Sequence, residues 1–222
     1  MPAEIVTITQ KYMMAVNCYL VKTSTGCILI DTGLPKRRGD LVRELEAADC
    51  GIGDLKLIVI THGHLYHNGS TAYLRERYGA KIAMHLGDSA MAESGDMFVG
   101  LKGLNVAVIR ALLPLVGMSR YEGFTPDILL EDGLDLSEHG LDAKVVHVPG
   151  HSKGSIGVLT TEGDLFCGDL LVNNKNLARN TLIDDQAEYD ASVERLKTLG
   201  IGTVYPGHGR PFKMEQFWEN SQ

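Results

Sequence analysis

THGHLYHNGS, residues 61–70, contains three histidines within six positions and a tyrosine between the last two of them. The stretch follows LKLIVI, residues 55–60, a continuous apolar run of the kind that forms a strand buried on both faces. After it, a helical pattern runs through Tyr73 and Tyr78 and is ended by Gly79. We therefore expect the histidines to lie on a loop between a buried strand and a helix, where α/β folds gather functional residues.

Four other polar segments also follow apolar runs. They are LIDTG ending at Gly33, VHVPGHSKGS around His151, LFCGDL around Asp169 and VYPGHG around His208. Helices are predicted over 36–48 and from about 187 to 199, with strands in the apolar runs. The same order of strand and polar loop occurs in both halves of the chain, without a Pro- or Ser-rich linker between them. The pattern predicts one mixed α/β domain over residues 1–222.

The five polar loops together supply ligands suited to a metal ion. Neutral imidazole binds zinc and iron well, and a catalytic site takes about three protein donors while leaving a position for water. His62 and His64 alternate along an extended segment, so both side chains should point to one side. His151 can then complete a triad, and Asp169 adds an anionic donor for one ion or a bridge between two. The candidate residues are His62, His64, His67, His151 and His208, with Asp31 and Asp169 as carboxylates.

Composition excludes several other classes of protein. The formal net charge of −7 argues against a nucleic-acid or anionic-membrane surface, and the hydrophobic content of 44% supports a substantial core. The first ten residues show no export signal, so a cytoplasmic location is expected. The four cysteines lack metal-binding spacing and are expected to be reduced core thiols.

The most apolar segment, residues 104–118, is interrupted by Arg110 and Pro114. It is also shorter than the roughly 20 residues that cross a membrane, so we interpret it as a buried or lid helix. It belongs to a predicted helical lid insertion at about residues 86–120. This helix could cover an acyl group or form a homodimer contact.

The loops at 62–67, His151, Asp169 and His208 resemble those of the metallo-β-lactamase fold superfamily, whose hallmark is an HxHxDH loop joined by later His, Asp and His positions. The resemblance implies a four-layer αββα sandwich of two mixed sheets with metals at one edge. It assigns His62, His64 and His151 to a first metal, Asp169 to a bridging role, and His67 and His208 to a second metal. Asp31 resembles an aspartate that orients a ligand histidine from outside the metal shell.

Tyr66 stands where this family pattern has an aspartate ligand. A phenol has a pKa near 10, against about 3.9 for aspartate, so a metal must displace a more tightly held proton. Three alternatives remain open: a weak or empty second site, a phenolate ligand that favours iron, or a phenol that turns toward substrate. We favour weak occupancy of the second site.

The function predicted from these residues is metal-dependent hydrolysis of an ester, thioester, lactone or lactam by a metal-activated water. Zinc, as one or two ions, is the expected cofactor, with iron or manganese as alternatives, and the partner is a small-molecule substrate. Asp169, His208 and Tyr66 are the catalytic candidates beside the metal ligands. A glutathione thioester is disfavoured, because only Arg210 and Lys213 lie near the end of the sequence.

Two other classes compete with the hydrolase. A mononuclear-iron persulfide dioxygenase would use His62, His151 and Asp169 as a facial triad. A weakly active or non-catalytic homologue would keep the metal without turnover, since a fold does not establish chemistry.

Overall fold

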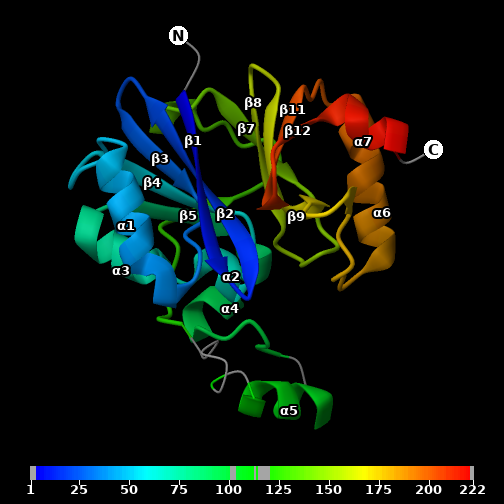
Figure 1. Ribbon diagram of the computed structural model, residues 1–222, viewed down its shortest axis with the longest axis horizontal. Helices are drawn as coiled ribbons and strands as arrows, with labels where there is room; N and C mark the ends of the chain where they lie inside the picture. Colours follow the sequence, from blue (N-terminus) through cyan, green and yellow to red (C-terminus); the bar gives the residue numbers. More distant parts are fainter. Residues whose placement is uncertain (1–3, 101–103, 113, 115–120, 221–222) are drawn as a thin grey trace.

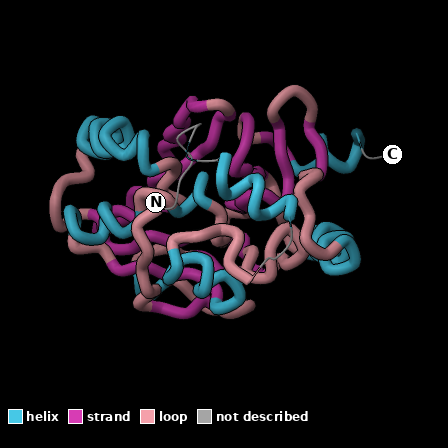
Figure 2. Tube along the Cα trace, turned by 90° about the horizontal axis from the view of Figure 1, so that it is seen from below, coloured by secondary structure: helices cyan, strands magenta, loops and turns pink. Residues whose placement is uncertain are grey.

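Two mixed β-sheets, each of six strands, form the centre of the protein (Figure 1). The computed structural model describes residues 4–220 except 101–103, 113 and 115–120. Helices α1 (Arg38–Ala47) and α3 (Thr71–Tyr78) flank the first sheet, and α6 (Gln186–Arg195) and α7 (Met214–Asn220) flank the second. Viewed from below, helices again lie at both sides of the strands (Figure 2). The four-layer αββα architecture expected from the sequence is confirmed.

The first sheet runs in the order β1 to β6. Its first three strands pair antiparallel, whereas β3, β4, β5 and β6 pair in parallel. The strands are β1 (Glu4–Tyr12), β2 (Met14–Thr23), β3 (Gly26–Ile30), β4 (Leu55–Ile60), β5 (Lys81–His85) and β6 (Ile128–Leu130). The carboxyl ends of β3, β4 and β5 therefore meet at one edge of the sheet, and the loops that follow them begin there.

The second sheet has the order β12-β11-β9-β8-β7, with β10 paired to β9. Its strands are β7 (Ala143–His147), β8 (Ile156–Thr160), β9 (Asp164–Asn173), β10 (Leu177–Arg179), β11 (Thr203–Gly209) and β12 (Phe212–Lys213). Only β9 and β11 pair in parallel, and their register shifts between Tyr205 and His208. Such an irregularity re-aims the side chains that follow it.

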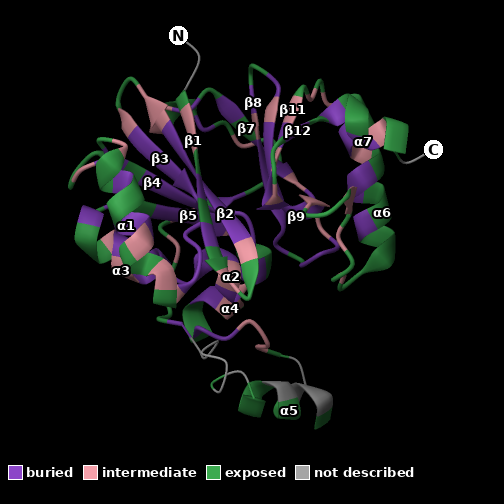
Figure 3. Ribbon diagram, in the orientation of Figure 1, coloured by how far each residue is buried: buried purple, intermediate pink, exposed green. Residues whose placement is uncertain are grey.

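Alternation along the strands divides the core into separate layers. On β2, Cys18 and Leu20 join the cluster beneath α1 and α3, while Tyr19 and Val21 join the cluster between the sheets. A third cluster lies between the second sheet and helices α6 and α7. Burial is accordingly concentrated in the strands and on the inner helix faces (Figure 3). Both faces of each sheet are covered, which explains continuous apolar runs such as residues 55–60.

Most predicted elements are present with bounds close to those expected. Residues 55–60 form β4, the 36–48 pattern forms α1, and the 187–199 pattern forms α6 and a 3-10 turn at Leu196–Thr198. Helix α7 was not predicted from the sequence. Nor was α2 (Leu65–Asn68), which places His67 on a helical turn rather than in the expected loop.

The segment between β5 and β6 is partly helical. It contains a 3-10 turn at Leu86–Asp88, α4 (Ser89–Ser94) and α5 (Leu104–Leu112). Helix α5 lies apart from the sandwich in Figure 1, and its Leu104 is 81% exposed, so of the two alternatives the buried helix is wrong and the lid helix stays a prediction. An ion pair of 2.9 Å joins Arg110 of α5 to Asp96. The end of the predicted helix, residues 115–118, lies outside the described residues.

Two further expectations concern membranes and thiols. Among the helices that the structure describes, none is long and apolar enough to cross a bilayer. All four cysteines are buried and free, as expected for reduced core thiols.

Phe166 offers a test of the core between the sheets. Its side chain is 1% exposed and lies with its ring centroid 5.3 Å from that of Tyr19. Phe166→Ala should lower the free energy of unfolding by about 3–5 kcal/mol, because it removes a buried ring and leaves a cavity. Urea denaturation measures the change. Ile52→Ala, at a side chain that is 75% exposed, is the control and should change stability by less than about 0.5 kcal/mol.

Candidate metal centre

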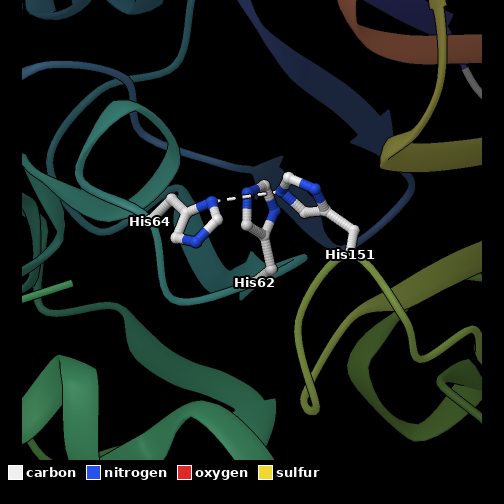
Figure 4. Close-up of side chains that lie close together, drawn as sticks. All are labelled: His62, His64 and His151. Atoms are coloured by element: carbon white, nitrogen blue, oxygen red, sulfur yellow. Dashed lines mark hydrogen bonds between the residues drawn. The ribbon is translucent and has the colours of Figure 1, made fainter. Parts of the chain in front are cut away.

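Three histidines from two separate loops meet at the edge where the sheets end (Figure 4). His62 and His64 follow β4, and His151 lies in the loop between β7 and β8. The His151 Nε2 atom is 3.1 Å from His64 Nδ1, and the ring centroids of His62 and His151 are 4.7 Å apart. One nitrogen from each ring falls within 4.8 Å of the others, a separation that one metal ion can span.

A second group of potential ligands adjoins the first. His62, His67 and Asp169 also bring one ligand atom each within 4.8 Å of one another, and all three side chains are buried. Asp169 comes from β9, and its Oδ2 atom is 3.2 Å from Nε2 of His208 on β11. All six predicted ligand residues therefore lie in one place, although His208 belongs to neither group of three.

Several buried ligand atoms in this cluster have no hydrogen-bond partner. They are His62 Nε2, His67 Nε2 and Asp169 Oδ1. The last two are 3.3 Å apart, but without the geometry of a hydrogen bond. Buried polar atoms are nearly always paired, and an unpaired set of this kind requires an explanation. A cation among these atoms would satisfy all three, so the residues present fit a metal ion.

The outer nitrogens of the histidine rings have defined partners. His67 Nδ1 is 2.8 Å from Asp31 Oδ2, and His208 Nδ1 is 2.6 Å from the carbonyl oxygen of Ala15. His151 Nδ1 similarly lies 2.5 Å from the carbonyl oxygen of Leu182. Such contacts fix the ring orientation and leave Nε2 facing the cluster, as is usual for histidines that bind metals.

Asp31 connects the loops after β3 and β4. Its carboxylate accepts hydrogen bonds of 2.8 Å from both the backbone N–H and the hydroxyl of Thr61, in addition to contacting His67. Its φ of 60° lies in the left-handed region, which aspartate tolerates better than most residues. The expected contact between Asp31 and a histidine is present, and its importance for a metal stays a prediction.

Two glycines allow the strands to approach the cluster. A Cβ atom on Gly207 would lie 2.5 Å from Asp169 Oδ1, and one on Gly168 would lie 2.6 Å from the Thr61 hydroxyl. Gly168 also has a φ of 51°, which a larger residue would adopt only with strain. The glycines before Asp169 and His208 are therefore steric requirements of the site.

The histidines differ in how readily they take up a proton. Burial and the adjacent imidazole of His151 lower the pKa of His64 to about 3, and burial and neighbouring imidazoles also lower the pKa of His62. Burial acts in the same direction on His67, but Asp169 and Asp31 raise its pKa to about 10. Burial opposes ionisation of Asp169 as well, yet His67 and His208 hold its pKa well below the usual range. Without a metal ion, burial thus favours the neutral forms of His62 and His64, whereas His67 is protonated beside the Asp169 carboxylate.

Tyr66 lies on α2, half-buried beside the cluster. Its pKa is raised above the usual value, mainly by burial and also by the charge of Asp169. The side chain lines the same cavity as His64 and His151. A more tightly held phenolic proton disfavours the alternative in which Tyr66 binds metal as a phenolate.

The cavity in front of the cluster has a volume of about 780 Å³. Met91, Met97 and Phe98 line one part of it, and Leu182 and Ile183 line another. Its charged lining residues are Asp88, Lys153, Asp184, Asp185 and Glu188. A mostly apolar cavity beside a few polar groups is typical of a small-molecule site.

Two residues that support the site were not predicted. Asn17 of β2 donates hydrogen bonds of 3.0 and 2.7 Å to the carbonyl oxygens of Pro206 and Gly209, which hold the His208 segment. Asp88, in the 3-10 turn that follows β5, contacts both loops that carry the first group of histidines, through Gly63 and Ser152. The signal for Asp88 was available, because HLGD is another polar segment that follows an apolar strand.

The chain is similar to several known proteins. Residues 13–208 match the family model described as the Metallo-beta-lactamase superfamily. Acyl-coenzyme A thioesterase MBLAC2 of Homo sapiens is 28% identical, covering 91% of this chain and 76% of its own length. Hydroxyacylglutathione hydrolase GloC of Haemophilus influenzae is 27% identical over 87% of this chain and 85% of its own. The crystal structure of TTHA1623 in a di-iron-bound form is 27% identical, with a TM-score of 0.74 and coverage of 95% and 96%.

Asp31→Asn should lower the pKa of His67, because it removes one of the two carboxylates that hold the ring protonated. Asparagine keeps the shape of the side chain and tolerates the left-handed backbone. NMR titration of the histidine rings in metal-free protein measures the shift. Asp54→Asn, at a carboxylate that caps only Gly51, is the control. An unchanged His67 pKa in Asp31→Asn would contradict the contribution of Asp31 to holding the ring protonated.

Proposed function

This chain belongs to the metallo-beta-lactamase superfamily, and we propose on that basis that it is a metal-dependent hydrolase. Its substrates are small acyl compounds, in the class of esters, thioesters, lactones and lactams. The observation that carries the proposal is the convergence of His62, His64 and His151 beside His67 and Asp169, with buried ligand atoms that have no hydrogen-bond partner. A purely structural polar cluster would be expected to satisfy these atoms internally.

The proposed roles follow from the contacts. His62, His64 and His151 would hold the first ion, and Asp169 with His67 and His208 would hold a second one. A divalent ion held there would supply a hydroxide nucleophile near neutral pH and would polarise the carbonyl group under attack. Asp169, whose Oδ2 atom lies 3.2 Å from His208 Nε2, would orient the nucleophile by accepting a hydrogen bond from it. Tyr66 faces the cavity, where its hydroxyl can donate a hydrogen bond to the substrate.

Zinc is the proposed cofactor, and iron is the main alternative. Imidazole and carboxylate ligands suit both metals. The di-iron form of TTHA1623 supports iron as an occupant of this fold. Because Tyr66 replaces an anionic ligand and has a raised pKa, we propose one tightly bound ion and a weak second site.

The cavity supports a substrate with an apolar acyl group. Met91, Met97 and Phe98 form an apolar wall close to the histidines. Relatives named as thioesterases, including MBLAC2 and the atrochrysone carboxyl ACP thioesterase of Aspergillus fumigatus, make a thioester the preferred bond. Lys153 is the one cation among the described lining residues, which include the acidic Asp184. This balance disfavours an anionic leaving group, whether glutathione or coenzyme A, so the likeness to MBLAC2 supports the thioester bond and not a particular leaving group.

The remaining proposals concern the surroundings of the site. Apolar side chains from residues 91–98 line the cavity, which supports a covering role for the segment at about 86–120 within one domain. A cytoplasmic location and a homodimer stay predictions.

A substrate panel tests the activity directly. Protein stripped of metal and reloaded with zinc, manganese or iron should hydrolyse simple acyl thioesters and esters faster than acyl-glutathione thioesters. Oxygen consumption with a persulfide under iron is measured in parallel. Oxygen uptake without any hydrolysis would replace the hydrolase with the dioxygenase, and failure of every substrate under every metal would support a non-catalytic protein.

His62→Ala should abolish turnover and reduce the affinity for metal by more than about 100-fold, because this ring belongs to both ligand groups. Metal content after dialysis and steady-state kinetics measure the two effects. His139→Ala is the matched control, since His139 lies in the 3-10 turn Ser137–His139, outside both groups. Retention of metal and activity by His62→Ala would defeat the assignment.

Tyr66→Asp should raise the metal content from about one ion toward two per chain, because it restores a carboxylate beside the second group. Elemental analysis after equilibration with excess zinc gives the stoichiometry. Tyr66→Phe, which removes only the hydroxyl, should leave the stoichiometry unchanged. If Tyr66→Asp also leaves it unchanged, the tyrosine does not explain the weak second site.

A further inference from the structure

Asp88 is a fully buried carboxylate outside the ligand cluster, with a relative exposure of 0%. It ends the 3-10 turn Leu86–Asp88, which directly follows β5. Its Oδ2 atom accepts hydrogen bonds from the backbone N–H of Gly63, at 2.7 Å, and from the hydroxyl of Ser152, at 2.6 Å. Its Oδ1 atom accepts one from the backbone N–H of Gly154, at 2.8 Å. A buried carboxylate is stable only with such donors, and all three come from just two loops.

Those two loops carry the first group of histidines. Gly63 stands between His62 and His64, and Ser152 follows His151 in the chain. The first loop extends from the sheet of β4 and the second from the sheet of β7. Asp88 therefore joins the histidine loops of the two sheets through a single side chain.

The backbone segments around Asp88 are closely packed, and side chains larger than glycine would not fit at their contact points. A Cβ atom on Gly154 would lie 2.6 Å from the Asp88 backbone nitrogen, and one on Gly63 would lie 3.1 Å from the Asp88 Cβ. A Cβ on Gly87 would meet the backbone of Lys153 and Gly154 at 2.8 Å. Glycine at each contact point brings the three backbones together around the carboxylate.

The carbonyl oxygen of Gly63 also has polar neighbours. The hydroxyl of Tyr121 donates to the carbonyl oxygen of Met91 at 2.8 Å and lies 3.3 Å from the carbonyl oxygen of Gly63. Asn68 donates a hydrogen bond of 3.0 Å to the same hydroxyl. The glycine between the two ligand histidines is thus held through its N–H by Asp88, and its carbonyl oxygen lies beside the Tyr121 hydroxyl.

We propose that Asp88 is a positioning residue that fixes the spacing between the His62–His64 loop and the His151 loop, and thereby sets the affinity of the first metal site. The proposal rests on the proposed function, because it assigns the metal to these histidines. Asp88 acts only through backbone groups and Ser152, so it neither binds the ion nor touches the reacting atoms. The backbone hydrogen bond of 2.9 Å from Ile156 to Thr61 also joins the two loops and is independent of Asp88. The fold is therefore expected to persist without the carboxylate.

Asp88→Asn gives a sharp test, because it conserves shape and removes acceptors. The Ser152 hydroxyl can rotate to accept from the new amide, but the N–H groups of Gly63 and Gly154 can only donate. One of these backbone donors must then face the amide NH₂ group and lose its partner. We expect the zinc affinity of metal-free protein to fall about 10–100-fold, the range for lost supports of metal ligands. Ser152→Ala, which removes one contact of three, should have a smaller effect in the same direction.

Asp127→Asn is the matched control. The Asp127 carboxylate accepts a hydrogen bond of 2.8 Å from Ile82, near the start of the same strand β5. Zinc dissociation constants come from competition with a chromophoric chelator, and the absorption spectrum of cobalt-loaded protein reports the ligand geometry. Amide exchange at Gly63 and thermal unfolding are measured without metal. Asp88→Asn should alter affinity, cobalt spectrum and Gly63 exchange, whereas Asp127→Asn should alter stability at most.

The outcomes separate the two hypotheses. If wild-type protein binds zinc and Asp88→Asn binds it equally well with an unchanged cobalt spectrum, the positioning role is overturned and the proposed function stands. If wild-type protein binds neither zinc, iron nor manganese, the proposed function fails and this inference fails with it. If Asp127→Asn weakens zinc binding as much as Asp88→Asn does, the effect reflects general destabilisation and the specific role of Asp88 is overturned.

Discussion

In the metal-free protein, the ion pair between Asp169 and His67 is the interaction that compensates the charges buried in the site. Both side chains are buried, and burying a charge is costly unless it is paired and hydrogen-bonded. Asp31 and His208 supply the additional partners, and each comes from a different strand end. The charged centre is consequently held by segments of both sheets, and a displacement of either sheet would leave a carboxylate or an imidazolium without compensation.

The sandwich fixes where the strands end and so places the partners that offset the free-energy cost of the buried charges. Parallel pairing of β3, β4 and β5 brings Asp31, the histidine loop and Asp88 to one edge. In the second sheet, the parallel pair β9 and β11 brings Asp169 next to His208. The apolar layer between the sheets holds the two halves in register, so precision at the polar edge depends on packing well away from it.

Much of this could be predicted from the sequence because local patterns determine it. Residues 55–60 form the expected buried strand, and the polar segments that follow the strands do converge. The αββα arrangement was predicted from the resemblance to the metallo-β-lactamase fold superfamily, since periodicity alone indicates only mixed α/β structure. The short helix α2 was missed because four residues are too few to show helical periodicity in the sequence. The position of Asp88 after a strand was a signal in the sequence, but its contacts with two backbone N–H groups and the Ser152 hydroxyl on distant loops could not be predicted from one sequence.

His62 belongs to both groups of potential ligands, and this sharing has a thermodynamic consequence. Its Nδ1 atom faces the hydroxyl of Thr61, so Nε2 is the nitrogen that remains to bind an ion. One ring nitrogen has one lone pair and cannot serve two ions at once. In the proposed assignment the first ion would take this imidazole, so the free energy of binding a second ion would rest on His67, Asp169 and His208 without it.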